Sequence, residues 1–273
     1  LTDEEIFEAA RTAAAHDFIN DFENGYETMV FMAWCSMVLT PIAGNRAKEA
    51  LPFGYIICGL ALLVSTFGDN IEQIAPMAPV LRSPLLSIHV VVIMISYTLL
   101  AFTMLNGVAA IVINATQKDR ALARSDIEEL QRRSPIMLYP AVFLLTAGIF
   151  IGAVWANISW GRYWGWDPKE TWALITVVCY AVVTHLHLFR RWSNPWLFNL
   201  SSVLAFASVL MTFFGVNYFL SGMHSYGQHD GVRGISVYLY GALAVVLLLA
   251  IFSRIKWKTV WCKETMQRGG GLR

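Results

Sequence analysis

Tryptophan is concentrated in one short stretch of this chain, which suggests a binding surface for a flat aromatic molecule. Five of the ten tryptophans fall within residues 155–172, in the segment WANISWGRYWGWDPKETW. Trp160, Trp164 and Trp166 alternate there with glycines, which let a planar partner approach the backbone. Indole rings at a membrane surface also anchor lipid, but anchoring does not require this many in one loop. We therefore expect a large planar π ligand here, with Tyr163 adding to the aromatic surface.

Two histidines flank that segment in the sequence and are candidate ligands for such a partner. His89 stands in SPLLSIHVVV, where Ser83 and Pro84 predict a helix start, so that His89 lies about 9 Å along its axis. His224, in FLSGMHSYG, directly follows a later apolar run. Imidazole is a common axial ligand of haem iron, and ligation from both sides needs two. Either residue alone could instead hydrogen-bond a neighbouring helix or lie among lipid headgroups, but the pair favours a haem site.

A third histidine is expected deep in the membrane. His185 follows Trp172 by 13 residues, which is about 20 Å along a helix. An ionisable residue inside a membrane span is a candidate for function. His187 points away from His185 and is expected at the interface, whereas His16 and His229 are interpreted as solvated residues.

Charged residues after the tryptophans have two interpretations. Asp167 and Glu170, in Asp-Pro-Lys-Glu, fit the N-cap and third position of a helix, as in a capping box; direct contact with the ligand is the alternative. Arg162 and Lys169 are cations beside the aromatic surface. Either could pair with a carboxylate such as a haem propionate, or else with lipid headgroups.

Composition places these residues in a membrane protein. Apolar residues make up 56% of the chain and charged residues 14%, against about 45–50% and about 25% in soluble domains, and mean hydropathy is +0.52. The sequence predicts an all-α, polytopic transmembrane helix bundle of about seven membrane helices, each of about 20 residues, with an extracytoplasmic tryptophan-rich loop. The predicted helices cover residues 27–43, 51–68, 85–113, 136–158, 171–190, 196–221 and 232–254.

The distribution of positive charge predicts the topology. Positively charged loops are typically cytoplasmic, so the tryptophan-rich loop is expected outside and the C-terminus inside. The net charge of +1 argues against a nucleic-acid partner. The positive segments are 44–50, 114–135, 190–195 and the C-terminal tail. The expected parts are an extracytoplasmic amphipathic segment (1–24), a membrane domain (25–256, with the tryptophan-rich loop at 155–172) and a basic cytoplasmic tail (257–273).

The start of the chain and its cysteines add two further expectations. The chain begins at Leu1 with an acidic amphipathic stretch and no preceding signal peptide. We therefore expect the C-terminal part of a larger exported polypeptide, a tail that translocates by itself being the alternative. The four cysteines are scattered, which excludes zinc, dithiol redox and covalent haem-attachment motifs.

Three motifs together resemble one protein family. WGRYWGWDPKETWALIT is similar to the tryptophan-rich WWD signature of cytochrome c assembly proteins, in the CcsA/ResC branch (system II). SIHVVVIMISY and FGVNYFLSGMHSYG resemble the two histidine motifs that flank it in that family. The resemblance runs from about residue 25 to about residue 230, and the motifs occur in the family's order.

The resemblance implies a haem-handling role. It makes haem b the transported substrate, His89 and His224 the external ligands of its iron, and His185 an intramembrane ligand. The second intramembrane histidine then belongs to a ResB/CcsB-type partner, which is fused to this half in some lineages. Apocytochrome c receives the haem, so that the chain is expected to act as a component of a holocytochrome c synthase in the bacterial cytoplasmic membrane. The aromatic residues named above, with Arg162 and Asp167, are expected around the haem, and no residue is identified as catalytic.

Two other classes remain open from the residues alone. A membrane b-type electron-transfer cytochrome should pair histidines at matching depth on two helices, whereas only His185 is deep. A haem or solute transporter should show broken helices or repeat symmetry near the midplane, and neither is evident in the sequence.

Overall fold

The protein is helical throughout the part that the structure describes. The computed structural model describes residues 25–44, 51–65, 83–189 and 194–216, together with 248, 251, 253 and 254, and no strand occurs in these residues. The helices are α3 (Gly25–Gly44), α4 (Leu51–Ser65), α5 (Pro84–Thr116), α6 (Arg120–Trp160), α7 (Pro168–His185) and α8 (Pro195–Leu210). A 3-10 turn (Leu186–Leu188) follows α7, and a π-helical turn (Met211–Gly215) follows α8.

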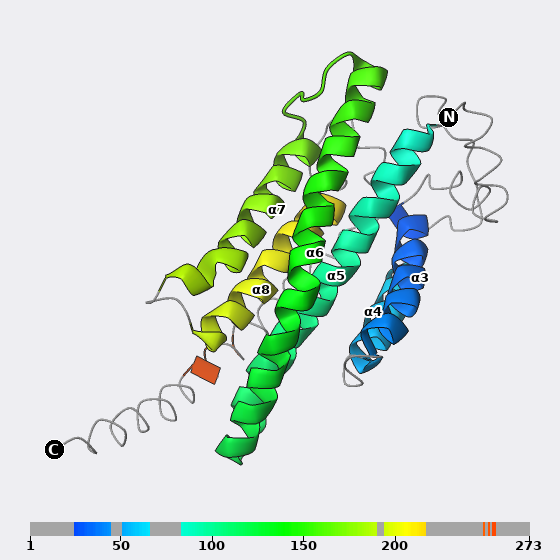
Figure 1. Ribbon diagram of the computed structural model, residues 1–273. Helices are drawn as coiled ribbons and strands as arrows, with labels where there is room; N and C mark the ends of the chain where they lie inside the picture. The colour runs from blue at the N-terminus through cyan, green and yellow to red at the C-terminus, as the bar shows by residue number, and fades with distance from the viewer. Residues whose placement is uncertain are drawn as a thin grey trace.

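The long helices form one bundle with the tryptophan-rich loop at one end. α5 and α6 run antiparallel along each other, α8 packs against α5 and α7, and α3 and α4 form a pair beside α5 (Figure 1). The start of α5 and the loop between α6 and α7 lie at the same end (Figure 1). This arrangement places the region of His89 and the tryptophan-rich loop on one side of a membrane.

The helices confirm a polytopic membrane protein. Four of them are long and apolar enough to cross a bilayer: Pro84–Thr116, Arg120–Trp160, Pro168–Leu188 and Pro195–Gly215. The apolar stretches of α3 and α4, Thr28–Pro41 and Pro52–Ser65, are shorter. The predicted seventh helix, 232–254, lies almost entirely outside the described residues, as do the segment 1–24 and the tail 257–273.

Proline begins three of these helices, because its fixed φ suits the first helical turn. Pro84, Pro168 and Pro195 stand at the starts of α5, α7 and α8. The Asn194 side chain caps α8 by accepting hydrogen bonds from the backbone amides of Trp196 and Leu197. Ser83 occupies the expected N-cap position of α5, but its side chain makes no capping hydrogen bond.

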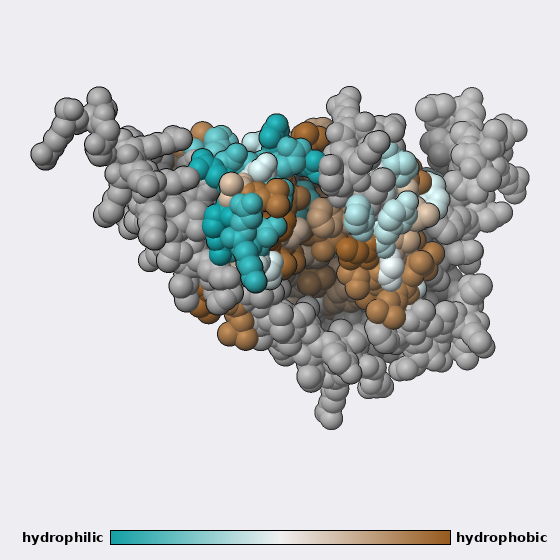
Figure 2. Space-filling model, turned by 90° about the horizontal axis from the view of Figure 1, so that it is seen from below, coloured by the Kyte–Doolittle hydropathy of each residue, from teal (hydrophilic) through white to brown (hydrophobic). Residues whose placement is uncertain are grey.

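The predicted loop 114–135 is wrong for most of its length, because α6 begins at Arg120 and runs for 41 residues. The Asp119 side chain caps it by accepting from two backbone amides. Ion pairs one turn apart, Arg124–Glu128 and Glu129–Arg133, both at 2.8 Å, support the charged first half. At about 1.5 Å per residue the helix is about 61 Å long, about twice the apolar core of a bilayer. Its charged end therefore projects from the membrane, and hydrophilic residues gather beside apolar surface at this end (Figure 2).

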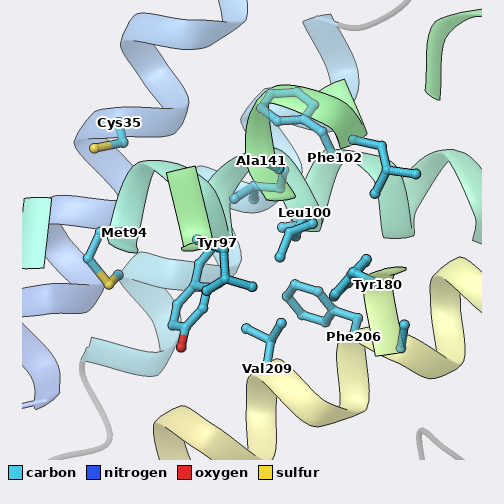
Figure 3. Close-up of a cluster of buried hydrophobic side chains, with 14 of the residues drawn as sticks. Cys35, Met94, Tyr97, Leu100, Phe102, Ala141, Tyr180, Phe206 and Val209 are labelled. Carbon is cyan, nitrogen blue, oxygen red and sulfur yellow. The ribbon is translucent and has the colours of Figure 1, made fainter. Parts of the chain in front are cut away.

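The core lies where α5 meets α6, α7 and α8. Leu100, Leu145 and Tyr180 are fully buried, and Tyr97, Leu100, Tyr180 and Phe206 converge from three helices (Figure 3). Hydrogen bonds between helices supplement this packing, since the Ser96 hydroxyl donates to the Ala141 carbonyl at 2.7 Å. This core holds the helices whose outer ends carry the candidate site.

Candidate functional site

The tryptophan-rich loop, expected over 155–172, is shorter in the structure: it is the connection 161–167, because α6 extends to Trp160 and α7 begins at Pro168. It starts at Gly161, whose φ of 71° ends α6 in the left-handed conformation that glycine adopts without strain. The Gly161 amide donates to the Asn157 carbonyl at 2.9 Å. Each end of the loop is thus attached to a membrane helix.

The predicted capping box at the start of α7 is confirmed. The Asp167 carboxylate accepts from the Lys169 amide, and Glu170 reaches back to the Asp167 amide. Glu170 also accepts from the Gly165 amide at 2.8 Å through the same oxygen, Oε2. Asp167 is buried, with 8% of its surface exposed. One carboxylate therefore holds the backbone on both sides of Trp166.

Trp166 has an unusual backbone conformation between those two amides. Its φ is 56°, the one positive value at a non-glycine residue in the described part of the chain. Such a conformation costs of the order of 1–3 kcal/mol and persists only where surrounding contacts hold it. The residue is 70% exposed. The loop thus presents a large aromatic ring outward on a strained backbone.

The aromatic rings form two edge-to-face pairs and not one flat surface. Trp164 and Trp166 lie 5.9 Å apart at 88°. Trp160 pairs instead with the buried Trp155, at 6.1 Å and 88°. Tyr163 is 60% exposed. The side of the loop open to a ligand is therefore formed mainly by Trp166 and Tyr163.

The two cations of the loop lie at different places. Arg162 is exposed, and its guanidinium packs over Gly165, where an added Cβ would lie 2.9 Å from Nε. Lys169, in the first turn of α7, is half-buried. Arg162 is therefore the cation better placed to meet an anionic group on a ligand at the loop.

His89 packs into the face of α6 below the loop. Its Nδ1 lies 2.7 Å from the Gly148 carbonyl oxygen, and a Cβ added to Gly152 would lie 2.7 Å from the imidazole ring. Trp160 lies eight residues beyond Gly152 on α6, which is about 12 Å along the helix axis. The structure therefore brings His89 to the helix that leads into the tryptophan-rich loop.

His185 lies at the opposite end of α7 from the loop. It is the last residue of the helix, and its side chain is exposed. Nδ1 lies 2.7 Å from the Ala181 carbonyl oxygen within the same helix. His187 is also exposed, and its Nδ1 lies 2.8 Å from the Thr184 carbonyl oxygen. His89 lies near the start of α5 and His185 at the end of α7, so the two histidines belong to different parts of the bundle.

The remaining predicted ligand, His224, lies outside the described residues, as do His16 and His229. In the described part of the chain, no group of three or more metal-binding side chains could hold a metal ion. A histidine beside exposed aromatic rings is a set of side chains that would suit a haem, whose iron histidine commonly binds.

Sequence reasoning missed two contributors to this region. Gly148 and Gly152, which receive Ile93 and His89, have the small-xxx-small spacing that permits close helix packing and could have been recognised from the sequence. The contact between Glu170 and the Gly165 amide could not, because it depends on the loop conformation.

Comparison with known proteins identifies similar chains. A family model described as "Cytochrome C assembly protein" matches residues 22–224. Protein NrfI of Wolinella succinogenes is 38% identical over 211 residues, which cover 75% of this chain but 23% of that protein. The cytochrome c biogenesis protein CcsA of Guillardia theta is 32% identical, over 75% of both chains. CcsA of Synechococcus sp. (strain CC9902) is 34% identical, over 75% of this chain and 77% of the relative.

Proposed function

Since this chain belongs to the cytochrome c assembly protein family, we propose that it moves haem b across the membrane and presents it for covalent attachment to apocytochrome c. The observation that supports this most directly is the geometry at the outer end of α5 and α6. There, a histidine packed on α6 lies about 12 Å along that helix from the loop that exposes Trp166 and Tyr163.

The proposed outer site contains one ligand from α5 and the tryptophan-rich loop. His89 and His224 would bind the iron, while the exposed Trp166 and Tyr163 would contact the porphyrin. Trp164 supports the Trp166 ring through their edge-to-face pair, whereas Trp160 packs against Trp155. Arg162, an exposed residue, would pair with a propionate.

His185 is proposed as the ligand through which haem passes earlier. Its position at the far end of α7 and its exposed side chain leave it accessible to a neighbouring subunit. We propose that a ResB/CcsB-type partner, or a fused half of the same polypeptide, supplies the opposing histidine. The bacterial cytoplasmic membrane, with the tryptophan-rich loop on the extracytoplasmic side, is the proposed location.

The chemical contribution of the chain is proposed to be positioning. Thioether formation adds the S–H of a cysteine across a haem vinyl group, so a C–S bond and a C–H bond form and no group leaves. Holding haem with its vinyl edge toward the Cys-x-x-Cys-His segment converts this into a step between oriented groups. We assign no general base to the chain.

The outer ligands are tested by replacing His89 with alanine. We expect cytochrome c maturation to be lost and the low-spin haem spectrum of the purified protein to disappear, with partial recovery when imidazole is added. His224→Ala should behave in the same way. If the protein were a transporter that does not ligate haem, replacing these histidines would not remove a low-spin haem spectrum. Normal maturation in either variant would show that the ligand assignment is wrong.

The inner ligand is tested separately by His185→Ala. We expect less haem per purified protein at unchanged membrane insertion, because the outer site would be filled less efficiently. His187→Ala is the matched control, since it removes a nearby exposed histidine that has no proposed role. Equal haem loading in His185→Ala and wild type would exclude the transit role.

A further inference from the structure

We propose that Gly148 and Gly152 of α6 form a cradle that sets the tautomer and position of His89, and that both are positioning residues for the outer haem site. The inference rests on the proposed function for its consequence, namely iron ligation. The cradle itself is defined by contacts between α5 and α6.

The hydrogen bond to Gly148 determines which ring nitrogen carries the proton. A carbonyl oxygen can only accept, so Nδ1 of His89 must be the donor at 2.7 Å from the Gly148 oxygen. In neutral imidazole the lone pair then lies on Nε2. The cradle therefore leaves Nε2 unprotonated, and an unprotonated nitrogen is what iron ligation requires.

The absence of a side chain at Gly152 determines where the ring lies. A Cβ there would lie 2.7 Å from both Cε1 and Nδ1 of His89, far closer than non-bonded carbon atoms pack. The imidazole ring is planar and cannot relieve this contact by bending, so the ring would have to move as a whole. An added methyl group would therefore rotate or displace the ring, and the Nδ1 hydrogen bond would break.

A hydrogen bond of this kind has a defined effect on ligation. Histidines that bind metals usually donate their other N–H to a carbonyl or carboxylate, which fixes ring orientation and increases the basicity of the binding nitrogen. Disturbing such a contact typically costs about 10- to 100-fold in metal affinity. The same change is expected for haem at the outer site.

Gly152→Ala in the full chain, purified with its native partner, tests the proposal. We expect haem affinity to fall by about 10-fold or more, together with a changed low-spin spectrum. Added imidazole should restore the spectrum, because it replaces the displaced ligand. A wild-type affinity and spectrum would overturn the proposal.

Two glycine controls separate positioning from packing. Gly59→Ala places a methyl group in open space on α4, with no heavy atom within 4 Å, and should change nothing. Gly107→Ala places its Cβ 2.7 Å from the Asn199 carbonyl oxygen at the α5–α8 contact. It should reduce the amount of folded protein without altering the spectrum per bound haem. Loss of haem affinity and an altered spectrum in Gly107→Ala, as in Gly152→Ala, would overturn the proposal.

The tautomer can be measured without any variant of the cradle, which matters if Gly152→Ala does not fold. In protein labelled with ¹⁵N-histidine, without haem and at a pH where imidazole is neutral, His89 is identified by the signal lost in His89→Ala. We expect protonated Nδ1 and unprotonated Nε2, and the opposite tautomer would refute the cradle. Normal maturation in His89→Ala, by contrast, would refute the proposed ligand and leave this measurement valid.

Discussion

At the scale of single residues, Trp166 combines exposure with a backbone that glycine would adopt more easily. Its left-handed conformation is held between the Gly165 and Asp167 amides, which both donate to Glu170. Strain that is kept at an exposed aromatic residue is typical of a functional position. We infer that the side chain, and not the stability of the loop, is the reason for a tryptophan at this position.

We therefore predict that Trp166→Gly separates folding from function. Removing the side chain relieves strain of the order of 1–3 kcal/mol, so thermal unfolding of the purified protein should change little or shift upward. Cytochrome c maturation should fall severely, whereas Trp166→Phe, which keeps a ring, should be mild. A fall in thermal stability with unchanged maturation would contradict a ligand-binding role for this ring.

Variants of Asp167 can also separate an effect on folding from an effect on function, because the structure supports the role of Asp167 as a helix cap. Asp167→Asn should be tolerated, since asparagine caps a helix about as well as aspartate. Asp167→Leu should cost about 1 kcal/mol of stability and lower maturation. Both are measured by thermal unfolding and by the yield of holocytochrome. If Asp167→Asn abolishes maturation in folded, haem-loaded protein, the carboxylate has a chemical role.

Much of the site could be predicted at this scale, and the failures have clear causes. The capping box of Asp167 and Glu170 follows from residue type and spacing, so it was correctly predicted. The edge-to-face pairing of the tryptophans was not, because ring orientation depends on loop dihedral angles that spacing does not determine. The haem contacts of His89 and the tryptophans stay predictions.

At the scale of the elements, helix starts were more predictable than helix lengths. Ser83–Pro84 and Asp167–Pro168 predicted the starts of α5 and α7, and the structure begins each helix there, whereas α6 was predicted from 136 and begins at Arg120. The first half of α6 was mistaken for a loop because it is charged. Its residues are nevertheless good helix formers with favourable pairs one turn apart.

A hydrogen bond between α7 and the π-helical turn provides a prediction at this scale. The hydroxyls of Thr176 and Thr212 lie 3.0 Å apart and are both buried. Such bonds between membrane helices contribute about 0.6 kcal/mol on average. A double-mutant cycle with Thr176→Val and Thr212→Val, measured by unfolding in mixed micelles, should give a coupling energy of this size. Additive effects would mean that the bond contributes nothing.

At the scale of the whole molecule, the bundle has two unlike ends. The tryptophan-rich loop lies at one end, and the charged first half of α6 projects at the other (Figure 1). We predict that Tyr163→Cys, in a background without the native cysteines, reacts with a membrane-impermeant thiol reagent in intact cells. Leu122→Cys, at the charged end and 49% exposed, should react only after permeabilisation. The reverse pattern would invert the proposed topology.

The two glycines of α6 also fix how far α5 can slide along it. His89 and Ile93, one turn apart on α5, fit against Gly152 and Gly148. A slide by one turn toward the loop would bring the imidazole to Ala156, and a slide the other way would bring Ile93 to Leu144. Neither position offers the room of a glycine, so both shifted registers are disfavoured. The position of His89 along α6 is therefore set by the scaffold. If His89 is the proposed ligand, haem would have to move to it, because the histidine itself is held in place.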